Sequence, residues 1–72
     1  DLLIANILAG PLIALAPDFA HTLMPGARVI LAGLLTTQEA RVTRAYQRQG
    51  LRLEHRIVDG DWSILCLRNV RG

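Results

Sequence analysis

Apolar and polar residues follow three different patterns along the chain, and these patterns predict its first elements. Residues 1–8 form a nearly continuous apolar run, which is typical of a strand that is buried on both faces of a parallel sheet. Residues 12–24 repeat apolar side chains at steps of three and four, which predicts helical structure. Residues 28–31 form a second short apolar strand that runs on toward Gly33.

Two prolines affect the prediction for the first helical stretch. Pro11 follows Gly10, and this pair predicts the start of the helix, because proline suits a first helical position. Pro17 lies inside the pattern, where a proline removes a backbone hydrogen bond and costs about 3 kcal/mol. We therefore expect a short first helix, a kink, and a second helix with Pro17 in its first turn.

A further helix is predicted over residues 38–49. Thr36 and Glu39 have the spacing of a T-x-x-E capping box at its start. Gly50 follows at the position where many helices end in a left-handed residue.

The last third of the chain changes period. Residues 51–57 alternate apolar and charged side chains, which predicts a half-exposed strand. Residues 59–61 read Asp-Gly-Asp and predict a turn into another strand over 62–68, so that the two strands form an antiparallel hairpin. Residues 69–72 are expected to form a frayed end.

The predicted order is strand, helix, strand, helix, strand, strand. It indicates an α/β fold, with a parallel pair of strands and an antiparallel C-terminal hairpin. Right-handed crossovers would place both helices on one face of the sheet and leave the other face bare. The first strand would form an open edge, although its composition is that of an interior strand. We therefore expect further polypeptide before Asp1.

Composition narrows the function classes. The chain has 72 residues, of which 51% are hydrophobic, and a domain of this size buries only about 60% of its unfolded surface. The longest apolar run falls short of the roughly 20 residues that span a bilayer. A net charge of +2 is too weak to imply nucleic-acid binding. The single cysteine, Cys66, excludes an intrachain disulfide and favours a reducing compartment such as the cytoplasm, and no Cys/His cluster suggests a metal site.

Candidate chemistry lies where the two parallel strands end. Ligands of open parallel sheets bind beyond the carboxyl ends of the strands, which here carry Asn6 and Gly33. Gln38 joins them at the start of the next helix. An amide offers two donors and an acceptor, so Asn6 and Gln38 are suited to holding a substrate amine in position.

These motifs resemble the bacterial ribosomal protein L11 methyltransferase family over nearly the whole chain. Residues 1–12 are similar to that family's segment in which an aspartate and an apolar strand lead into N-I-L-A. Residues 23–26 resemble its L-x-P-G-G turn, and residues 32–38 resemble its S-G-I-L-x-x-Q. The chain departs from the pattern at Ala27, where a second glycine is usual, and at Ala32, where serine is usual.

The resemblance implies that residues 1–72 form the C-terminal half of a Rossmann-like class I methyltransferase domain. Such a family transfers methyl groups from S-adenosylmethionine to lysine and N-terminal amines of a ribosomal protein. Asn6 matches the active-site asparagine, with a catalytic role and a contact to the cofactor. Ile7 and Leu8 would line the substrate pocket, and Gly33 with Gln38 would shape its wall.

Two features bear on that implication. Related enzymes that act on planar amides or adenine carry an N-P-P-Y motif with a ring for stacking, whereas residues 7–9 here are aliphatic and suit an aliphatic amine. No G-x-G occurs in the 72 residues, so the glycine-rich loop and the acidic residue that anchor the cofactor in such folds are absent from this sequence. The chain alone is therefore expected to be inactive.

Other interpretations stay open. Asn6 could simply cap the next helix, Gln38 could be an ordinary first-turn residue, and Gly33 could serve only a turn at the end of its strand. Cys66 is expected in the core, and so is Trp62, although Trp62 could instead line the rim of the sheet. Arg41, Arg44 and Arg48 share one helix face, which is more often solvated than bound to RNA or an acidic partner. The rival function is a non-catalytic α/β module that pairs with another chain or with itself through its exposed sheet edge.

Overall fold

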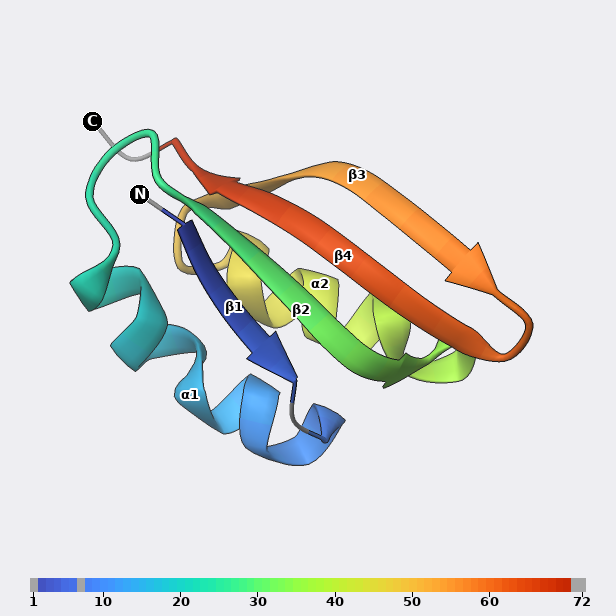
Figure 1. Cartoon of the computed structure of the whole chain (residues 1–72). Helices are drawn as coiled ribbons and strands as arrows, with labels where there is room; N and C mark the ends of the chain where they lie inside the picture. Colours follow the sequence, from blue (N-terminus) through green and yellow to red (C-terminus); the bar gives the residue numbers. More distant parts are fainter. Residues whose placement is uncertain (1, 7, 71–72) are drawn as a thin grey trace.

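The computed structural model describes residues 2–6 and 8–70. Strands and helices follow one another in the predicted order (Figure 1). Their bounds are β1 (Leu2–Asn6), α1 (Ala9–Thr22), β2 (Arg28–Leu35), a short 3-10 helix η1 (Thr36–Gln38), α2 (Glu39–Gln47), β3 (Leu51–Asp59) and β4 (Trp62–Asn69).

The four strands form one sheet in the order β1-β2-β4-β3. β1 and β2 are parallel, and β4 is antiparallel to both of its neighbours, so the predicted parallel pair and C-terminal hairpin are confirmed. The position of β4 between β2 and β3 joins the hairpin to the parallel pair. Because of this order, side chains from the end of the chain lie beside the carboxyl ends of β1 and β2.

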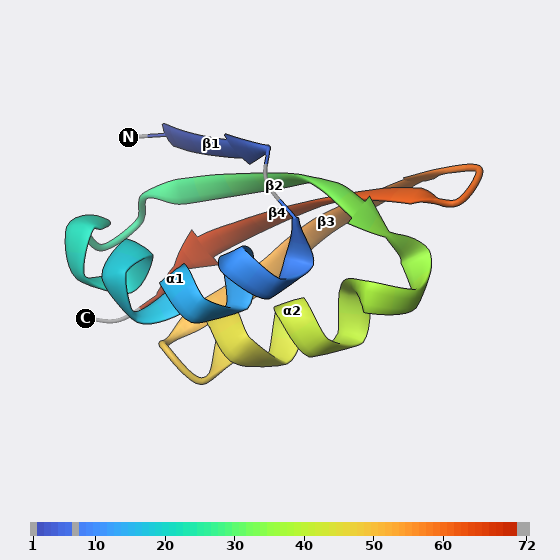
Figure 2. The same cartoon turned by 90° about the horizontal axis from the view of Figure 1, so that it is seen from below.

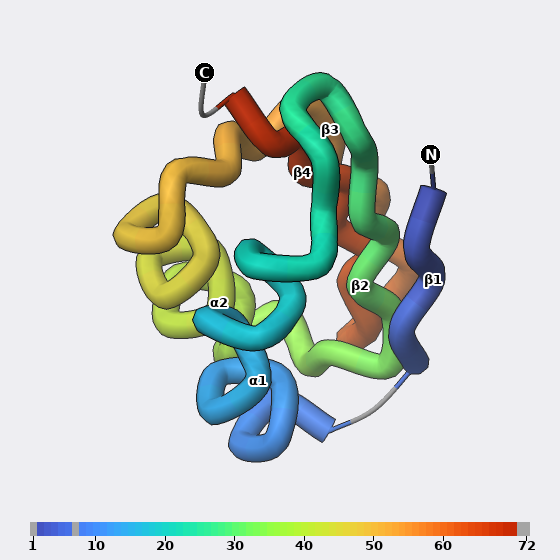
Figure 3. The backbone as a smooth tube through the Cα atoms, turned by 90° about the vertical axis from the view of Figure 1, so that its left-hand side faces the viewer, coloured from blue at the N-terminus to red at the C-terminus, as the bar shows by residue number. Residues whose placement is uncertain are grey.

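Both helices cover the same face of the sheet, as the right-handed crossovers predict. Figure 2 shows α1 and α2 side by side beneath the strands, and the view turned about the vertical axis agrees (Figure 3). The core lies between these two layers, because alternate side chains of each strand point toward the helices. Its buried side chains include Leu12, Val29, Leu31, Leu34, Val42, Tyr46, Leu65 and Leu67.

The opposite face of the sheet, called the outer face below, is uncovered by the described residues. Leu2 and Ile4 on β1 are 58% and 64% exposed, and Ile57 and Ile64 on the hairpin are also exposed. β1 lies at the edge of the sheet, and only β2 pairs with it among the described residues. The expectations of a bare face and an open, apolar edge are therefore confirmed for this part of the chain.

The prediction for the first helix is wrong in two respects. The helix begins at Ala9 rather than Pro11, and it continues through Pro17 without dividing into two helices. Pro11 still lies in the first turn, where backbone N–H groups have no helical partner. Pro17 is exposed, whereas Leu12, Ala16 and Ala20 are buried on one face that extends to both sides of it. Packing of this face holds the two halves in one helix.

No helix in the described ranges is both long and apolar enough to cross a membrane. The helix that follows β2 begins at Glu39, one residue later than predicted, after the turn η1. Gly50 has φ 91°, so the predicted left-handed residue after α2 is confirmed.

Asn69 is not part of a frayed end, which corrects the prediction for residues 69–72. Its side chain is buried, and its Nδ2 donates to the carbonyl oxygen of Leu23 over 2.9 Å. Its backbone N–H donates to the carbonyl of Ala27 over 2.8 Å. These bonds fix the end of β4 against the turn that precedes β2. Residues 71 and 72 lie outside the described residues.

Tyr46 joins the two helices inside the core. Its hydroxyl donates to the carbonyl oxygen of Leu12 over 2.9 Å, and the centroid of its ring lies 6.2 Å from the centroid of the Phe19 ring. Burial raises the pKa of Tyr46 from 10.0 to about 12, because the anion would lose its hydration.

The raised pKa of Tyr46 predicts a loss of stability at high pH. The folded state holds the phenolic proton more tightly than the unfolded state, so this contribution is complete below about pH 10 and declines as pH rises toward about 12. Tyr46 is the only tyrosine, so ultraviolet titration of tyrosinate should give a midpoint near 12 in folded protein and near 10 in denaturant.

Tyr46→Phe is the matched variant, because it keeps the ring and removes the hydroxyl. It should lower the free energy of unfolding by about 1 kcal/mol and should lack the wild-type decline above pH 10. A midpoint near 10 in protein that is still folded would contradict this account.

Candidate functional site

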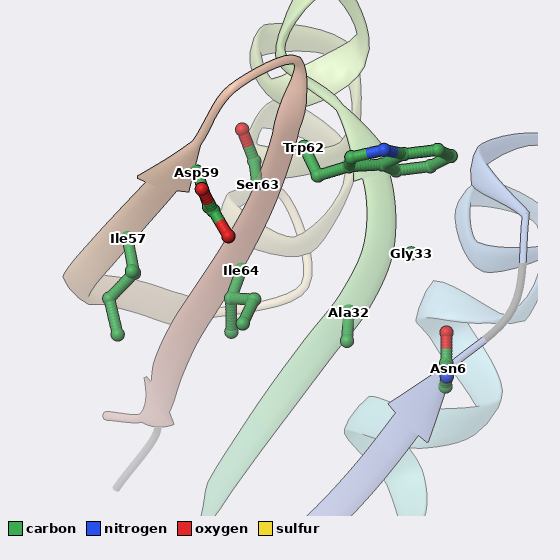
Figure 4. A pocket seen from close by; sticks show the side chains of 8 residues that line it. All are labelled: Asn6, Ala32, Gly33, Ile57, Asp59, Trp62, Ser63 and Ile64. Carbon is green, nitrogen blue, oxygen red and sulfur yellow. The ribbon is translucent and has the colours of Figure 1, made fainter.

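An open hollow of about 360 Å³ lies on the outer face (Figure 4). It lies where the carboxyl end of β1 faces β2 and the tip of the β3–β4 hairpin. Its lining comes from all four strands: Asn6, Ala32, Gly33, Ile57, Asp59, Trp62, Ser63 and Ile64.

Asn6 reaches the hollow because β1 and β2 are parallel and end at a common edge. Asn6 is the last residue of β1, is exposed, and pairs in register with Ala32. The predicted proximity of Asn6 to the end of β2 is therefore confirmed as geometry. The role of Asn6 remains a proposal, taken up below.

Gly33 marks an irregularity in β2 beside Asn6. Leu31 pairs with Leu65 and Leu34 pairs with Ser63, so Ala32 and Gly33 together face a single residue of β4. Such a bulge bends a strand and redirects its side chains. Gly33 has φ 79°, a backbone conformation that is unfavourable for residues that have a Cβ atom. Glycine is thus needed within the strand, rather than in a turn after its end.

The hairpin supplies Asp59, which sequence reasoning missed, and Trp62, for which the rim of the sheet was only the alternative to the core. Asp59 and Trp62 are cross-strand partners next to the turn, and both are exposed. In Figure 4 the indole ring of Trp62 extends from β4 across β2 toward the side of Asn6. The expectation that Trp62 lies in the core is wrong: it is 55% exposed, because it alternates with the inward-facing Ser63 and Leu65. That alternation was a usable signal for its outward direction.

The side chain of Gln38 forms a local hydrogen bond and does not enter the hollow. Its Oε1 accepts a hydrogen bond from the backbone N–H of Leu35 over 3.0 Å, so it caps the start of η1. The predicted capping box of Thr36 and Glu39 is therefore wrong by one residue, and the Glu39 carboxylate binds the hairpin instead. Gln38 is not among the described residues that line the hollow.

The other two predicted pocket residues follow Asn6 directly. Ile7 lies outside the described residues. Leu8 is 72% exposed and precedes α1, and it does not contribute to the hollow as the described residues form it.

The remaining candidates lie away from the hollow. Arg41, Arg44 and Arg48 are exposed, as expected of a solvated face, and they border a shallow groove with Ile13 and Ala45 on the helical side. Cys66 is half-buried on the outer face rather than fully buried. Among residues 2–6 and 8–70, no group of His, Cys, Asp or Glu side chains is placed to hold a metal ion.

The lining combines few polar groups with apolar walls. Asn6 offers a carboxamide, Asp59 offers the one carboxylate in the lining, and Ala32, Ile57 and Ile64 are aliphatic. A carboxamide orients a ligand N–H or carbonyl without exchanging a proton. The arrangement therefore suits positioning of a small cationic or amine-bearing group better than acid–base chemistry.

Comparison with known proteins gives a consistent result. The profile of the family described as "Ribosomal protein L11 methyltransferase (PrmA)" matches residues 1–70. A ribosomal protein L11 methyltransferase of Bradyrhizobium diazoefficiens is 55% identical over 71 residues, and one of Caulobacter sp. (strain K31) is 50% identical over 68 residues. These alignments cover 97% and 94% of this chain and 24% of each relative. The chain thus spans about a quarter of the length of the curated relatives it matches.

The fold agrees with the sequence comparison. The crystal structure of a ribosomal protein L11 methylase from Lactobacillus delbrueckii subsp. bulgaricus superposes with a TM-score of 0.90 and 26% sequence identity. The superposition covers 97% of this chain and 36% of that chain. The predicted Rossmann-like methyltransferase architecture is confirmed by this match.

Proposed function

This chain belongs to the ribosomal protein L11 methyltransferase family, and we propose that its hollow is the substrate side of a methyltransferase that uses S-adenosylmethionine. The proposed substrate is a lysine or N-terminal amine of a ribosomal protein in the cytoplasm, with no direct contact to nucleic acid. The observation that carries the proposal is the exposed carboxamide of Asn6 at the shared end of two parallel strands, beside an otherwise mostly apolar hollow.

Asn6 acts by orientation in this proposal. Its side-chain oxygen accepts a hydrogen bond from the substrate N–H, which aims the nitrogen lone pair at the methyl group. Methyl transfer needs an uncharged amine in line with the donor, and fixing that geometry supplies much of the rate. Asn6 would also contact the cofactor.

The residues that line the hollow attract the substrate amine and favour its uncharged form. Asp59, the one carboxylate of the lining, attracts a protonated amine, and the indole of Trp62 adds an aromatic face that cations favour. The aliphatic side chains of the lining disfavour the charged amine, because an apolar environment lowers the pKa of an ammonium group. Ile7 and Leu8 would extend this aliphatic lining beyond the hollow that the described residues form, Gly33 would shape its wall, and Gln38 would support that wall only through the turn that it caps.

The residues of this chain fit the amine better than they fit the cofactor. S-adenosylmethionine supplies the methyl group when bound. Its main anchors in such folds are a glycine-rich loop and an acidic residue, and no G-x-G occurs in these 72 residues. We therefore propose that residues 1–72 act as the C-terminal part of a methyltransferase domain whose cofactor-binding part they do not contain.

Asn6→Ala in a full-length family member that carries these residues should lower kcat/KM for the ribosomal protein by about 10- to 100-fold, because a hydrogen bond at the reacting amine is lost. Gln47→Ala removes an exposed carboxamide on α2 and serves as the control, with unchanged kinetics. Methyl incorporation from labelled cofactor measures both. Equal activity of Asn6→Ala and wild type would refute the assigned role.

The chain of 72 residues alone should show no measurable heat on calorimetric titration with S-adenosylmethionine, since the usual anchors are missing from its sequence. A full-length family member, titrated in parallel, provides the positive control. Tight, stoichiometric binding to the short chain would overturn the proposal that the cofactor-binding part lies outside these 72 residues.

A second candidate function has its own supporting observation. β1 is an edge strand, and its exposed Leu2 and Ile4 continue the apolar outer face of the sheet. Edges and faces of this kind pair with other chains. The alternative is a non-catalytic module that self-associates through this edge.

Size-exclusion chromatography of the short chain tests association. We expect a species larger than a monomer, and Ile4→Lys should shift it toward monomer by placing a charge at the edge. Val70→Lys, at an exposed apolar residue beyond β4, is the matched control and should leave the elution volume unchanged. Elution as a monomer at high protein concentration would count against self-association through the edge of β1.

A further inference from the structure

The carboxylate of Glu39 ties α2 to the hairpin. Glu39 is the first residue of α2, and its side chain is only 14% exposed. Arg56 on β3 donates to it twice, from Nε to Oε2 over 2.9 Å and from Nη2 to Oε1 over 3.1 Å. Ser63 on β4 donates its hydroxyl to the same carboxylate. One side chain therefore holds both strands of the hairpin.

A second bond reinforces this tie at the turn. The backbone N–H of Thr36, at the start of η1, donates to the carbonyl oxygen of Asp61 over 2.8 Å. The segment that begins at Thr36 and continues into α2 thus contacts the hairpin at its turn and along both strands. The negative charge of Glu39 also suits the first turn of a helix.

The tip that is held in this way forms one wall of the hollow. Five of the lining residues belong to the hairpin: Ile57, Asp59, Trp62, Ser63 and Ile64. Figure 2 shows this tip extending beyond the helices. At the tip β4 still pairs with β2, through Ser63 and Trp62, whereas β3 is an edge strand that pairs only with β4 among the described residues. The position of the tip relative to Asn6 therefore depends on this pairing together with contacts such as those of Glu39.

Ser63 links the Glu39 carboxylate directly to the strand that lines the hollow. It is 1% exposed and points toward the helices, whereas the neighbouring Trp62 and Ile64 point to the outer face. Fixing the Ser63 hydroxyl on Glu39 fixes the backbone from which Trp62 projects. Arg56 does the same on β3, three residues before Asp59.

We propose that Glu39 is a positioning residue, which sets Trp62 and Asp59 opposite Asn6 and so determines how the hollow receives the substrate side chain. The inference rests on the proposed function of the hollow. Glu39 does not line the hollow and touches no reacting group, so its effect passes through Arg56 and Ser63.

Glu54 provides a matched control on the same sheet. It also pairs with two arginines: it accepts a hydrogen bond from Nε of Arg28 over 3.1 Å and forms an ion pair with Arg68 over 3.1 Å, and its side chain is 17% exposed. These partners lie toward the other end of the hairpin and do not line the hollow. Loss of Glu54 therefore reports the general effect of losing a bridging carboxylate.

The test compares Glu39→Gln, Arg56→Gln and Glu54→Gln in a full-length family member that carries these residues. Glu39→Gln should raise KM for the ribosomal protein roughly tenfold while kcat stays within about twofold and KM for S-adenosylmethionine is unchanged. Arg56→Gln should reproduce this split, and the double variant should be no worse than either single variant, because both remove one coupled contact. Glu54→Gln should leave all three constants unchanged.

Hydrogen exchange of residues 57–64 gives a readout that does not need activity. Exchange in this segment should accelerate in Glu39→Gln and Arg56→Gln and not in Glu54→Gln. Acceleration with unchanged KM would overturn positioning of substrate, and equal exchange in Glu39→Gln and Glu54→Gln would overturn the tie itself. Failure of the proposed function appears separately, as wild-type protein that methylates no ribosomal protein or as an Asn6→Ala variant with normal activity.

Discussion

One-sided burial is the constraint on which the rest of this structure depends. The inward side chains of β2 and β4 bury against α1 and α2, so the hydrophobic core that the described residues form lies on one face of the sheet. The ends of the strands and the outer face are thereby left for other contacts. The hollow beside Asn6 lies on this outer face, where its residues are not required to fill the core.

Much of the architecture could be predicted because local signals and the sheet agree. The continuous apolar run of β1 and the alternation of β3 identified strands of different kinds, and Gly50 marked the turn after α2. The errors arose where tertiary contacts overrule local preference. Pro17 stays within one helix because packing on both sides of it holds the helix together, and Asn69 is ordered by bonds to residues more than forty positions earlier.

The candidate site was predictable only in part. Asn6 and Gly33 could be placed because parallel strands end at the same edge, which is a rule about topology. Asp59 and Trp62 reach the same hollow through the insertion of β4 beside β2, and no local pattern specifies that strand order. The direction of the Gln38 side chain could not be predicted, because it satisfies a backbone N–H three residues before it, a bond that depends on the local turn.

The central position of β4 has a consequence for how the fold is assembled. β4 is the last of the described strands in sequence, yet it separates β2 from β3 in the sheet. During synthesis the preceding elements emerge first, and the edges of β2 and β3 that pair with β4 have no partner until the residues of β4 leave the ribosome. Loss of this strand through premature termination would therefore remove the middle of the sheet rather than trim its margin, and partly made chains would expose unpaired edges that favour aggregation.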